Sequence, residues 1–230
     1  MIESIVDCLE PVTLIGGGQA TPEDLEIALT LAPTCIAADS GAHFAREAGV
    51  SLAAVIGDFD SVSPDVLAGI AAHRQHRIAE QDSTDFEKAL TRITAPVVVG
   101  VGFTGGRVDH QLAAFHTLAA YPARRCVLLG PSEIVLLSPP RLALPTQAGD
   151  VISLFPLGPV QGGSTGLEWP IDGLAFDPLR QIGTSNRATG ACEITMQTPD
   201  MLMILPRRLI QPVVAQLLRP DAAQWSARAG

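Results

Sequence analysis

The chain has 230 residues, of which 15 are basic and 24 are acidic, so its formal net charge is −9. Proteins that bind nucleic acid by neutralising phosphates need a basic excess, which this sequence lacks. No apolar run reaches the roughly 18–20 residues of a membrane span, and the N-terminus does not resemble a signal peptide. Four widely spaced cysteines without a C-x-x-C motif favour a reducing compartment. We therefore expect a cytoplasmic protein that binds neither nucleic acid nor membrane.

The acidic excess lies in the first part of the chain. Residues 1–130 carry 16 acidic and 8 basic side chains, whereas residues 131–230 carry 8 and 7. At 47% hydrophobic residues the chain has enough apolar side chains for sizeable cores, and its length allows one large or two small domains. The uneven charge indicates two regions with different roles, and the acidic region either stays solvated or binds cations.

Strand-like and helix-like segments alternate over the first 130 residues. Short apolar runs predict strands at 12–15, 35–38, 52–56, 97–101 and 126–129. Capping residues followed by helical periodicity predict helices at 21–31, 42–48, 63–72, 84–93 and 108–120. This alternation predicts an α/β domain with a mainly parallel sheet and helices on both faces.

The last hundred residues have a different pattern. Glycine and proline separate short strand candidates at 134–137, 151–155, 174–176, 191–196 and 201–205, and a helix is expected only at 212–218. Such a pattern predicts a smaller all-β sandwich. With the boundary near Ser138-Pro139-Pro140, the expected domains are residues 1–138 and 139–230.

Aspartates follow the predicted strands or open the predicted helices: Asp39, Asp58, Asp60, Asp85 and Asp109. Ligands of open α/β sheets bind beyond the carboxyl ends of the strands, so these carboxylates are candidates for one shared site. In an extended Asp58-Phe59-Asp60 segment both carboxylates point to the same side, as Mg²⁺ binding requires. The alternatives are a solvated turn for Asp58 and Asp60 and favourable first-turn positions for Asp85 and Asp109.

Two glycine-rich turns also follow strands. The segment from Gly100 to Gly105 fits G-x-G-x-x-G but lacks the acidic residue expected about 20 positions later, and Gly16-Gly17-Gly18 lacks the G-K-[ST] of a P-loop. Both matches are weak. Either turn still allows a phosphate to approach backbone N–H groups at a helix start.

Taken in order, these segments resemble the thiamine pyrophosphokinase family. The resemblance rests on five motifs: Asp39-Ser40-Gly41-Ala42, Gly57-Asp58-Phe59-Asp60-Ser61, Thr84-Asp85-Phe86-Glu87-Lys88-Ala89-Leu90, Thr104-Gly105-Gly106-Arg107-Val108-Asp109-His110, and Thr165-Gly166-Leu167-Glu168-Trp169-Pro170 with Thr184-Ser185-Asn186. Ser40 and His43 replace the Gly and Asn that the first motif usually has.

The resemblance implies a thiamine diphosphokinase, in which Mg²⁺ supports transfer of the pyrophosphoryl group of ATP to the thiamine hydroxyl, giving thiamine diphosphate and AMP. It implies an ATP-binding α/β catalytic domain, a thiamine-binding sandwich, and a homodimer with its active site at the subunit interface. The implied metal and catalytic carboxylates are Asp58, Asp60, Asp85 and Asp109. The implied ATP-binding residues are Asp39, Gly41, Ala42, Gln81, Thr104, Gly105, Gly106 and Arg107. The implied thiamine-binding residues are Trp169, Ser185 and Asn186.

Three side chains suit this chemistry. Arg107 offers two parallel hydrogen bonds to phosphate, and the indole of Trp169 suits the thiazolium charge, its alternative being core filling. Lys88, the chain's single lysine, is expected either to reach the phosphates, to fix a carboxylate, or to pair with Asp85 at i,i+3. Two other functions stay open: another Mg²⁺-dependent phosphotransferase or nucleotidyltransferase, and a thiamine or nucleotide sensor without catalysis.

Overall fold

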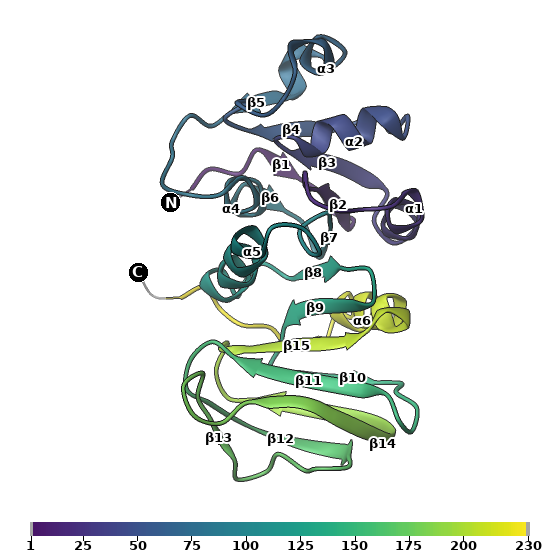
Figure 1. Cartoon of the computed structure of the whole chain (residues 1–230), viewed down its shortest axis with the longest axis vertical. Coiled ribbons are helices and arrows are strands. Elements are labelled where there is room, and N and C mark those ends of the chain that lie inside the picture. Colours follow the sequence, from purple (N-terminus) through teal and green to yellow (C-terminus); the bar gives the residue numbers. More distant parts are fainter. Residues whose placement is uncertain (1, 229–230) are drawn as a thin grey trace. The chain divides into compact units, whose positions relative to one another are not determined.

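The computed structural model describes residues 2–228 and divides into two compact units (Figure 1). The first unit contains residues 2–117 and 128–131, and the second contains residues 118–127 and 132–228. Each unit is made of two separate segments of the chain, so no single boundary divides them. The predicted domain boundary at residue 138 stays a prediction. Among residues 2–228, no helix has both the length and the apolar character that a membrane span requires.

Short parallel strand pairs form the centre of the first unit. β2 (Val12–Ile15) pairs with β7 (Val98–Val101), and β4 (Ala54–Gly57) lies between β3 (Thr34–Ala38) and β5 (Gln75–Arg77). β1 (Val6–Asp7) and β6 (Ile93–Thr94) form a separate parallel pair, and β8 is Cys126–Leu129. Every residue of β2, β4 and β7 is buried, as expected for the continuous apolar runs of parallel strands.

The helices begin where capping residues predict them. They are α1 (Pro22–Leu31), α2 (Gly41–Glu47), α3 (Pro64–Ala68), α4 (Asp85–Thr91) and α5 (Val108–Ala120), with a 3₁₀ turn at Ala72–Arg74. Thr21 and Asp24 form a complete capping box at α1, and the Thr84 hydroxyl accepts a hydrogen bond from the Glu87 N–H at α4. The α4 cap places Asp85 at the first helical position and directs Lys88 one turn further along.

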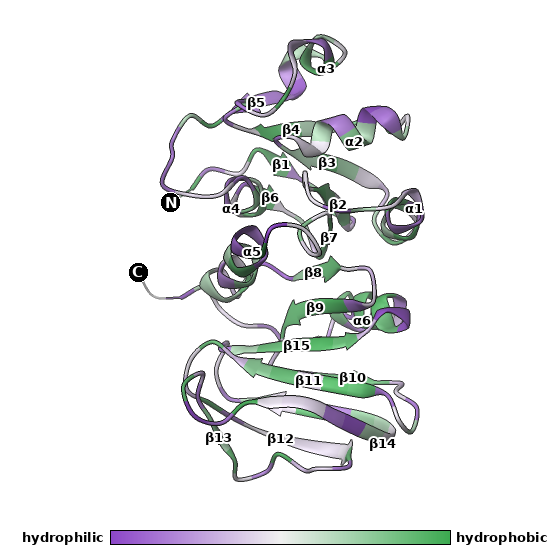
Figure 2. Cartoon of the chain, viewed as in Figure 1, coloured by the Kyte–Doolittle hydropathy of each residue, from purple (hydrophilic) through white to green (hydrophobic). Residues whose placement is uncertain are grey.

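Antiparallel strands dominate the second unit. β9 (Glu133–Leu137), β15 (Met201–Pro206), β11 (Val151–Pro156), β14 (Gly183–Met196), β12 (Val160–Leu167) and β13 (Ala175–Phe176) pair in this order, and β10 (Arg141–Leu144) pairs with β14. A 3₁₀ turn (Arg207–Leu209) leads into α6 (Ile210–Leu217). Figure 2 shows β9, β11 and β15 in hydrophobic colours, whereas β12, with its glycine and hydroxyl side chains, is nearly white.

The predicted fold class, a mainly parallel sheet with helices on both faces plus an all-β sandwich, is wrong. Of the ten strand pairs with a defined register among the described residues, six are antiparallel and four parallel, so the strand arrangement is mixed and mostly antiparallel. The helices are few, and α2, α3 and α4 have only five to seven residues. The prediction failed because local periodicity identifies strands and helices but not which strands pair.

Candidate active site

A cavity of about 630 Å³ opens in the first unit at the ends of its strands. It lies where the segments after β2, β3, β4 and β7 meet the first turns of α4 and α5. Its volume suits a drug-sized ligand such as a nucleotide. The residues around it are Gly16, Gly17, Gly18, Gln19, Ala38, Ser40, Asp58, Asp60, Ser61, Gln81, Ser83, Thr84, Asp85, Phe86, Lys88, Gly102, Phe103, Thr104, Gly106, Arg107 and His110.

The acidic turn after β4 is held by a buried aspartate at the end of β3. The Phe59 N–H donates to the Asp39 carboxylate over 2.9 Å, and Phe59 has a φ of 66°, which is uncommon for a bulky residue. The expectation of an extended Asp58-Phe59-Asp60 segment is therefore wrong. Carboxylate oxygens of Asp39, Asp58 and Asp60 nevertheless lie within 4.8 Å of one another, so the turn brings three carboxylates together.

Lys88 provides the cation beside these carboxylates. Its Nζ lies 2.8 Å from Asp58 Oδ2 and 3.4 Å from Asp85 Oδ1, and the residue is only 2% exposed. Burial by itself would lower the pKa of Lys88, but the bonds and charges of Asp58 and Asp85 outweigh it, so the pKa is raised. Two of the expected roles, fixing a carboxylate and pairing with Asp85, are present in the structure.

The same contact controls the ionisation of Asp58. Its hydrogen bond from Lys88, together with those from the Asp60 N–H and the Gln81 amide, lowers the pKa of Asp58 to about 2. Burial raises the pKa of Asp39, as do the negative charges nearby, and burial also raises the pKa of Asp85. One carboxylate of the cluster is thus strongly ionised, while two others are difficult to ionise without a further cation.

This ionisation predicts how stability depends on pH without divalent cations. Because the pKa of Asp58 is lower in the folded chain than its ordinary 3.8, its contribution is present above pH 4 and is lost as the pH falls toward 2. The expected loss is about 2 kcal/mol. Asp39 and Asp85 have a raised pKa in the folded chain, so each lowers the free energy of unfolding as the pH rises above the ordinary value of 3.8. Urea unfolding between pH 5 and pH 2 should show a smaller loss of unfolding free energy in Asp58→Asn than in the wild type. An equal loss in both proteins would contradict the lowered pKa of Asp58.

Asp109 lies apart from this arrangement. Its side chain is 64% exposed and forms a bidentate pair with Arg107, at 3.1 Å from Nε to Oδ1 and 2.6 Å from Nη2 to Oδ2. The Arg107 hydrogen bond lowers the pKa of Asp109. In this conformation the guanidinium binds its own helix start, and it must release Asp109 before both of its donors can bind phosphate.

The two glycine-rich turns lie against each other at the cavity. The Gly16 N–H donates to the Val101 carbonyl, and the Gly18 N–H donates to the Gly102 carbonyl over 2.9 Å. A Cβ on Gly18 would lie 2.5 Å from the Gly102 oxygen, and Gly102 has a φ of 79°, so only glycine fits either position. Because these two amides hold the turns together, they are not available to a phosphate.

The other predicted ATP-binding residues lie in the first turn of α2 and in the segments that precede α4 and α5. Gly41 and Ala42 are buried in the first turn of α2, and Gln81 reaches the cavity beside Asp58. The Thr104 hydroxyl is buried and has no hydrogen-bond partner within the described part of the chain. Gly106 lines the cavity, and the Gly105 N–H donates to the Gln111 side chain.

The predicted thiamine-binding residues lie in the second unit. Trp169 is 54% exposed, which excludes the alternative of core filling. Asn186 is buried and binds the Trp169 backbone twice, accepting from its N–H at 3.2 Å and donating to its carbonyl at 2.7 Å. Ser185 has a φ of 64°, and its N–H donates to the Ser153 hydroxyl at an irregularity between β11 and β14. Asn186 therefore positions Trp169 and leaves the indole in solvent.

The two departures from the usual first motif have local explanations. The Ser40 hydroxyl lies where a Cβ on Gly17 would be, so a serine fits because position 17 is glycine. His43 Nε2 lies 3.2 Å from both the Ser61 carbonyl and the Ser63 N–H. His43 thus supports the end of the acidic turn.

Sequence reasoning missed several residues at the cavity. Phe103 packs against Phe86 with ring centroids 4.5 Å apart, and Ser83 and His110 also line the cavity. His110 lies in the first turn of α5, immediately after Asp109. Its position in the predicted helix start therefore indicated that it lies near the candidate site. The left-handed conformation of Phe59, outside the cavity lining, had no local signal, because it accompanies a hydrogen bond to Asp39 twenty positions away.

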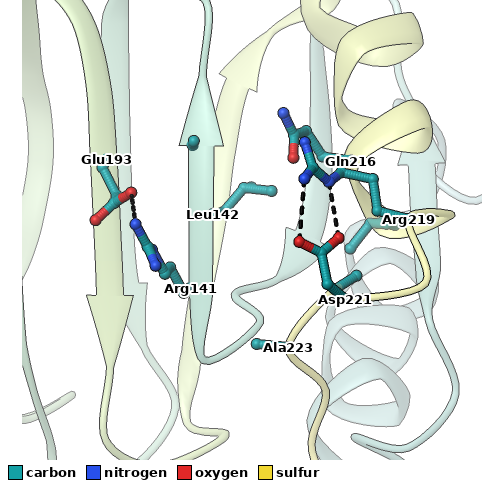
Figure 3. A pocket seen from close by; sticks show the side chains of 10 residues that line it. Arg141, Leu142, Glu193, Gln216, Arg219, Asp221 and Ala223 are labelled. Atoms are coloured by element: carbon teal, nitrogen blue, oxygen red, sulfur yellow. Dashed lines mark hydrogen bonds and ion pairs between the residues drawn. The ribbon is translucent and has the colours of Figure 1, made fainter.

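A smaller cavity of about 330 Å³ lies in the second unit beside β10, β14 and α6. Its charged side chains are already paired with each other: Arg141 with Glu193, and Arg219 with Asp221 through two bonds (Figure 3). Such pairs leave little charge to attract a ligand. The cavity of the first unit, with its unbalanced carboxylates, is therefore the better candidate for chemistry.

Comparisons with known proteins agree with this choice. Residues 25–128 match the family described as thiamin pyrophosphokinase, catalytic domain. Thiamine pyrophosphokinase 3 of Oryza sativa subsp. japonica is 26% identical over 167 residues, covering 64% of this chain and 62% of that protein. Thiamine pyrophosphokinase 2 of Arabidopsis thaliana is 29% identical over 149 residues, covering 56% of each. The chain thus spans about three fifths of the length of the curated relatives it matches.

Solved structures show the same fold. A thiamin pyrophosphokinase from Candida albicans superposes with a TM-score of 0.71 at 18% identity, covering 89% of this chain and 93% of that one. The enzyme of that name from Geobacillus thermodenitrificans gives 0.71 at 24% identity, covering 85% and 97%. The solved structures show the shared fold, and the family match lies on residues 25–128, which include most of the first unit. The resemblance to the thiamin pyrophosphokinase family that the sequence motifs indicate is thus confirmed by the family match and by the named relatives.

Proposed function

We propose that the chain is a thiamine diphosphokinase, which transfers the pyrophosphoryl group of ATP to the thiamine hydroxyl and releases AMP. The observation that supports it best is the meeting of three carboxylates, from Asp39, Asp58 and Asp60, of which the last two line a cavity bordered by two glycine-rich turns. Phosphoryl transfer needs positioning and neutralisation of charge, rather than a covalent contribution from the protein. A carboxylate cluster beside a nucleotide-sized cavity provides both.

The proposed metal is Mg²⁺, held by carboxylates of the set Asp58, Asp60, Asp85 and Asp109. The donor chemistry fits, because clustered carboxylate oxygens are hard ligands and Mg²⁺ usually shares its shell with water and substrate phosphates. When bound, the ion neutralises charge that develops on phosphate oxygens. Asp58, fixed by Lys88 and Gln81, keeps its ionised form and its orientation. Asp60 is exposed and accessible to a ligand.

The proposed ATP contacts use donors around the first turn of α5. The N-terminus of this 13-residue helix favours negative charge. The unpartnered Thr104 hydroxyl and the Arg107 guanidinium lie there, and Arg107 can exchange its exposed pair with Asp109 for a phosphate. Asp39, Gly41, Ala42, Gln81, Gly105 and Gly106 complete the proposed ATP site.

The proposed thiamine site consists of Trp169, Ser185 and Asn186. An exposed indole is a suitable face for a thiazolium cation, worth about 0.5–2 kcal/mol. Asn186 fixes the backbone of Trp169, so the ring is presented without a large loss of freedom on binding. A homodimer with the active site at the subunit interface stays a prediction. The four free cysteines support the proposed cytoplasmic location.

The products of the reaction test this function. With ATP, Mg²⁺ and thiamine we expect AMP and thiamine diphosphate in equal amounts, and no AMP when thiamine is omitted. Chromatography of the nucleotides, with a thiamine-free control, makes the measurement. Formation of ADP, or turnover independent of thiamine, would indicate another phosphotransferase on this scaffold. Binding of thiamine without any turnover would indicate a sensor.

A further inference from the structure

Asp39 is a buried carboxylate for which the chain supplies too few partners. The residue is 1% exposed, and its Oδ2 atom is buried without a hydrogen-bond donor among residues 2–228. Its other contact is the hydrogen bond from the Phe59 N–H to Oδ1. An ionised carboxylate buried with one oxygen unpaired is costly, so such groups are normally paired with a cation or bound to a metal.

The cation nearest to this cluster is already in use. Lys88 Nζ contacts Asp58 and Asp85, at 2.8 and 3.4 Å, and no ion pair among the described residues joins it to Asp39. The charges around Asp39 that affect it are those of Asp85, Asp58 and Asp60, all negative. Asp39 therefore adds a negative charge to a group of carboxylates that one lysine cannot balance.

We propose that Asp39 is a direct ligand of the divalent cation, together with Asp58 and Asp60. Ligand oxygens of these three residues lie within 4.8 Å of one another, which a single ion can bridge. The inference rests on the proposed function, and it changes the role expected for Asp39 from a nucleotide contact to a metal ligand. Asp109, by contrast, lies exposed in its pair with Arg107.

A different role for Asp39 must be separated from this one. Its Oδ1 holds the Phe59 N–H and thereby the left-handed turn between Asp58 and Asp60. Asp39→Asn distinguishes the two roles, because an asparagine oxygen still accepts this hydrogen bond while the negative charge is removed. If Asp39 only holds the turn, the variant binds metal as the wild type does.

The test measures Mn²⁺ binding to the full chain by electron paramagnetic resonance, without ATP or thiamine. Mn²⁺ is the probe because it accepts the same carboxylate ligands as Mg²⁺. We expect Asp39→Asn to weaken Mn²⁺ binding by at least about tenfold. Loss of an outer-shell partner typically costs about 10–100-fold in metal affinity, and loss of a charged direct ligand should cost no less. Asp65→Asn, an exposed aspartate at the start of α3, removes the same charge from the same unit and should bind Mn²⁺ like the wild type.

Thermal unfolding supplies the second measurement. Without metal, Asp39→Asn should unfold at or above the wild-type midpoint, because it removes an unbalanced buried charge, and Mn²⁺ should raise its midpoint less than that of the wild type. Unchanged Mn²⁺ affinity in Asp39→Asn, no Mn²⁺ binding by the wild type, or a variant that unfolds well below the wild type without metal would each overturn the proposal. AMP formation, measured separately, tests the proposed function, so the two can fail independently.

Discussion

Asp60→Asn is expected to reduce kcat for AMP formation by at least about 10²-fold, as for a lost metal ligand or general base. Asp60 is the exposed member of the carboxylate cluster, and its ligand oxygen lies within 4.8 Å of those of Asp39 and Asp58. Among the described residues, its carboxylate accepts one hydrogen bond, from the neighbouring Ser61 hydroxyl at 2.8 Å. The substitution should therefore disturb the ligand set while leaving the fold intact.

The measurement is steady-state turnover at saturating ATP and thiamine, with the Mg²⁺ concentration varied. We expect the KM for thiamine to change little, because the proposed thiamine contacts lie elsewhere in the chain. Asp65→Asn serves as the matched control and should retain wild-type turnover. Near-normal kcat in Asp60→Asn would exclude a role for this carboxylate in the reaction.

Lys88→Met is expected to destabilise the folded chain by about 3–5 kcal/mol in the absence of divalent cations. Removal of one partner of a buried ion pair leaves the other charge buried and unbalanced, which costs about this amount. Here the stranded groups are Asp58, with a side chain only 9% exposed, and Asp85. Methionine retains the length of the buried stem, so the loss reports on the charge rather than on a cavity.

Urea unfolding with and without Mg²⁺ makes this measurement. Saturating Mg²⁺ should restore part of the lost free energy of unfolding, because the ion neutralises the carboxylates that lysine no longer balances. Lys88→Arg is the control, since it keeps the positive charge and should lose less stability than Lys88→Met. An unfolding midpoint for Lys88→Met equal to that of the wild type would show that the ion pair contributes no stability.

The sequence predicted local structure well where the signal lies within a few residues. The capping box of Thr21 and Asp24 and the cap of Thr84 lie where their spacing indicated, and the predicted helix at 212–218 corresponds to α6. Strand pairing was predicted wrongly, because a strand of two to five residues carries no information about its partner. The β1–β6 pair, for example, joins residues almost ninety positions apart.

By itself, the sequence determined the carboxylates available for chemistry, their order along the chain, and the resemblance of residues 25–128 to the thiamin pyrophosphokinase family. Only the tertiary structure decided how these groups are used. It buries Asp39 beside Asp58 and Asp60, binds Lys88 to a carboxylate thirty positions away, and leaves Asp109 with Arg107 at the surface. The physical reason is that burial and ion pairing depend on distances between segments remote in sequence, whereas helix starts depend on neighbouring residues. Three of the 16 acidic residues among the first 130 thereby form one compact cluster, Asp39, Asp58 and Asp60, and the chain's single lysine, Lys88, lies beside it.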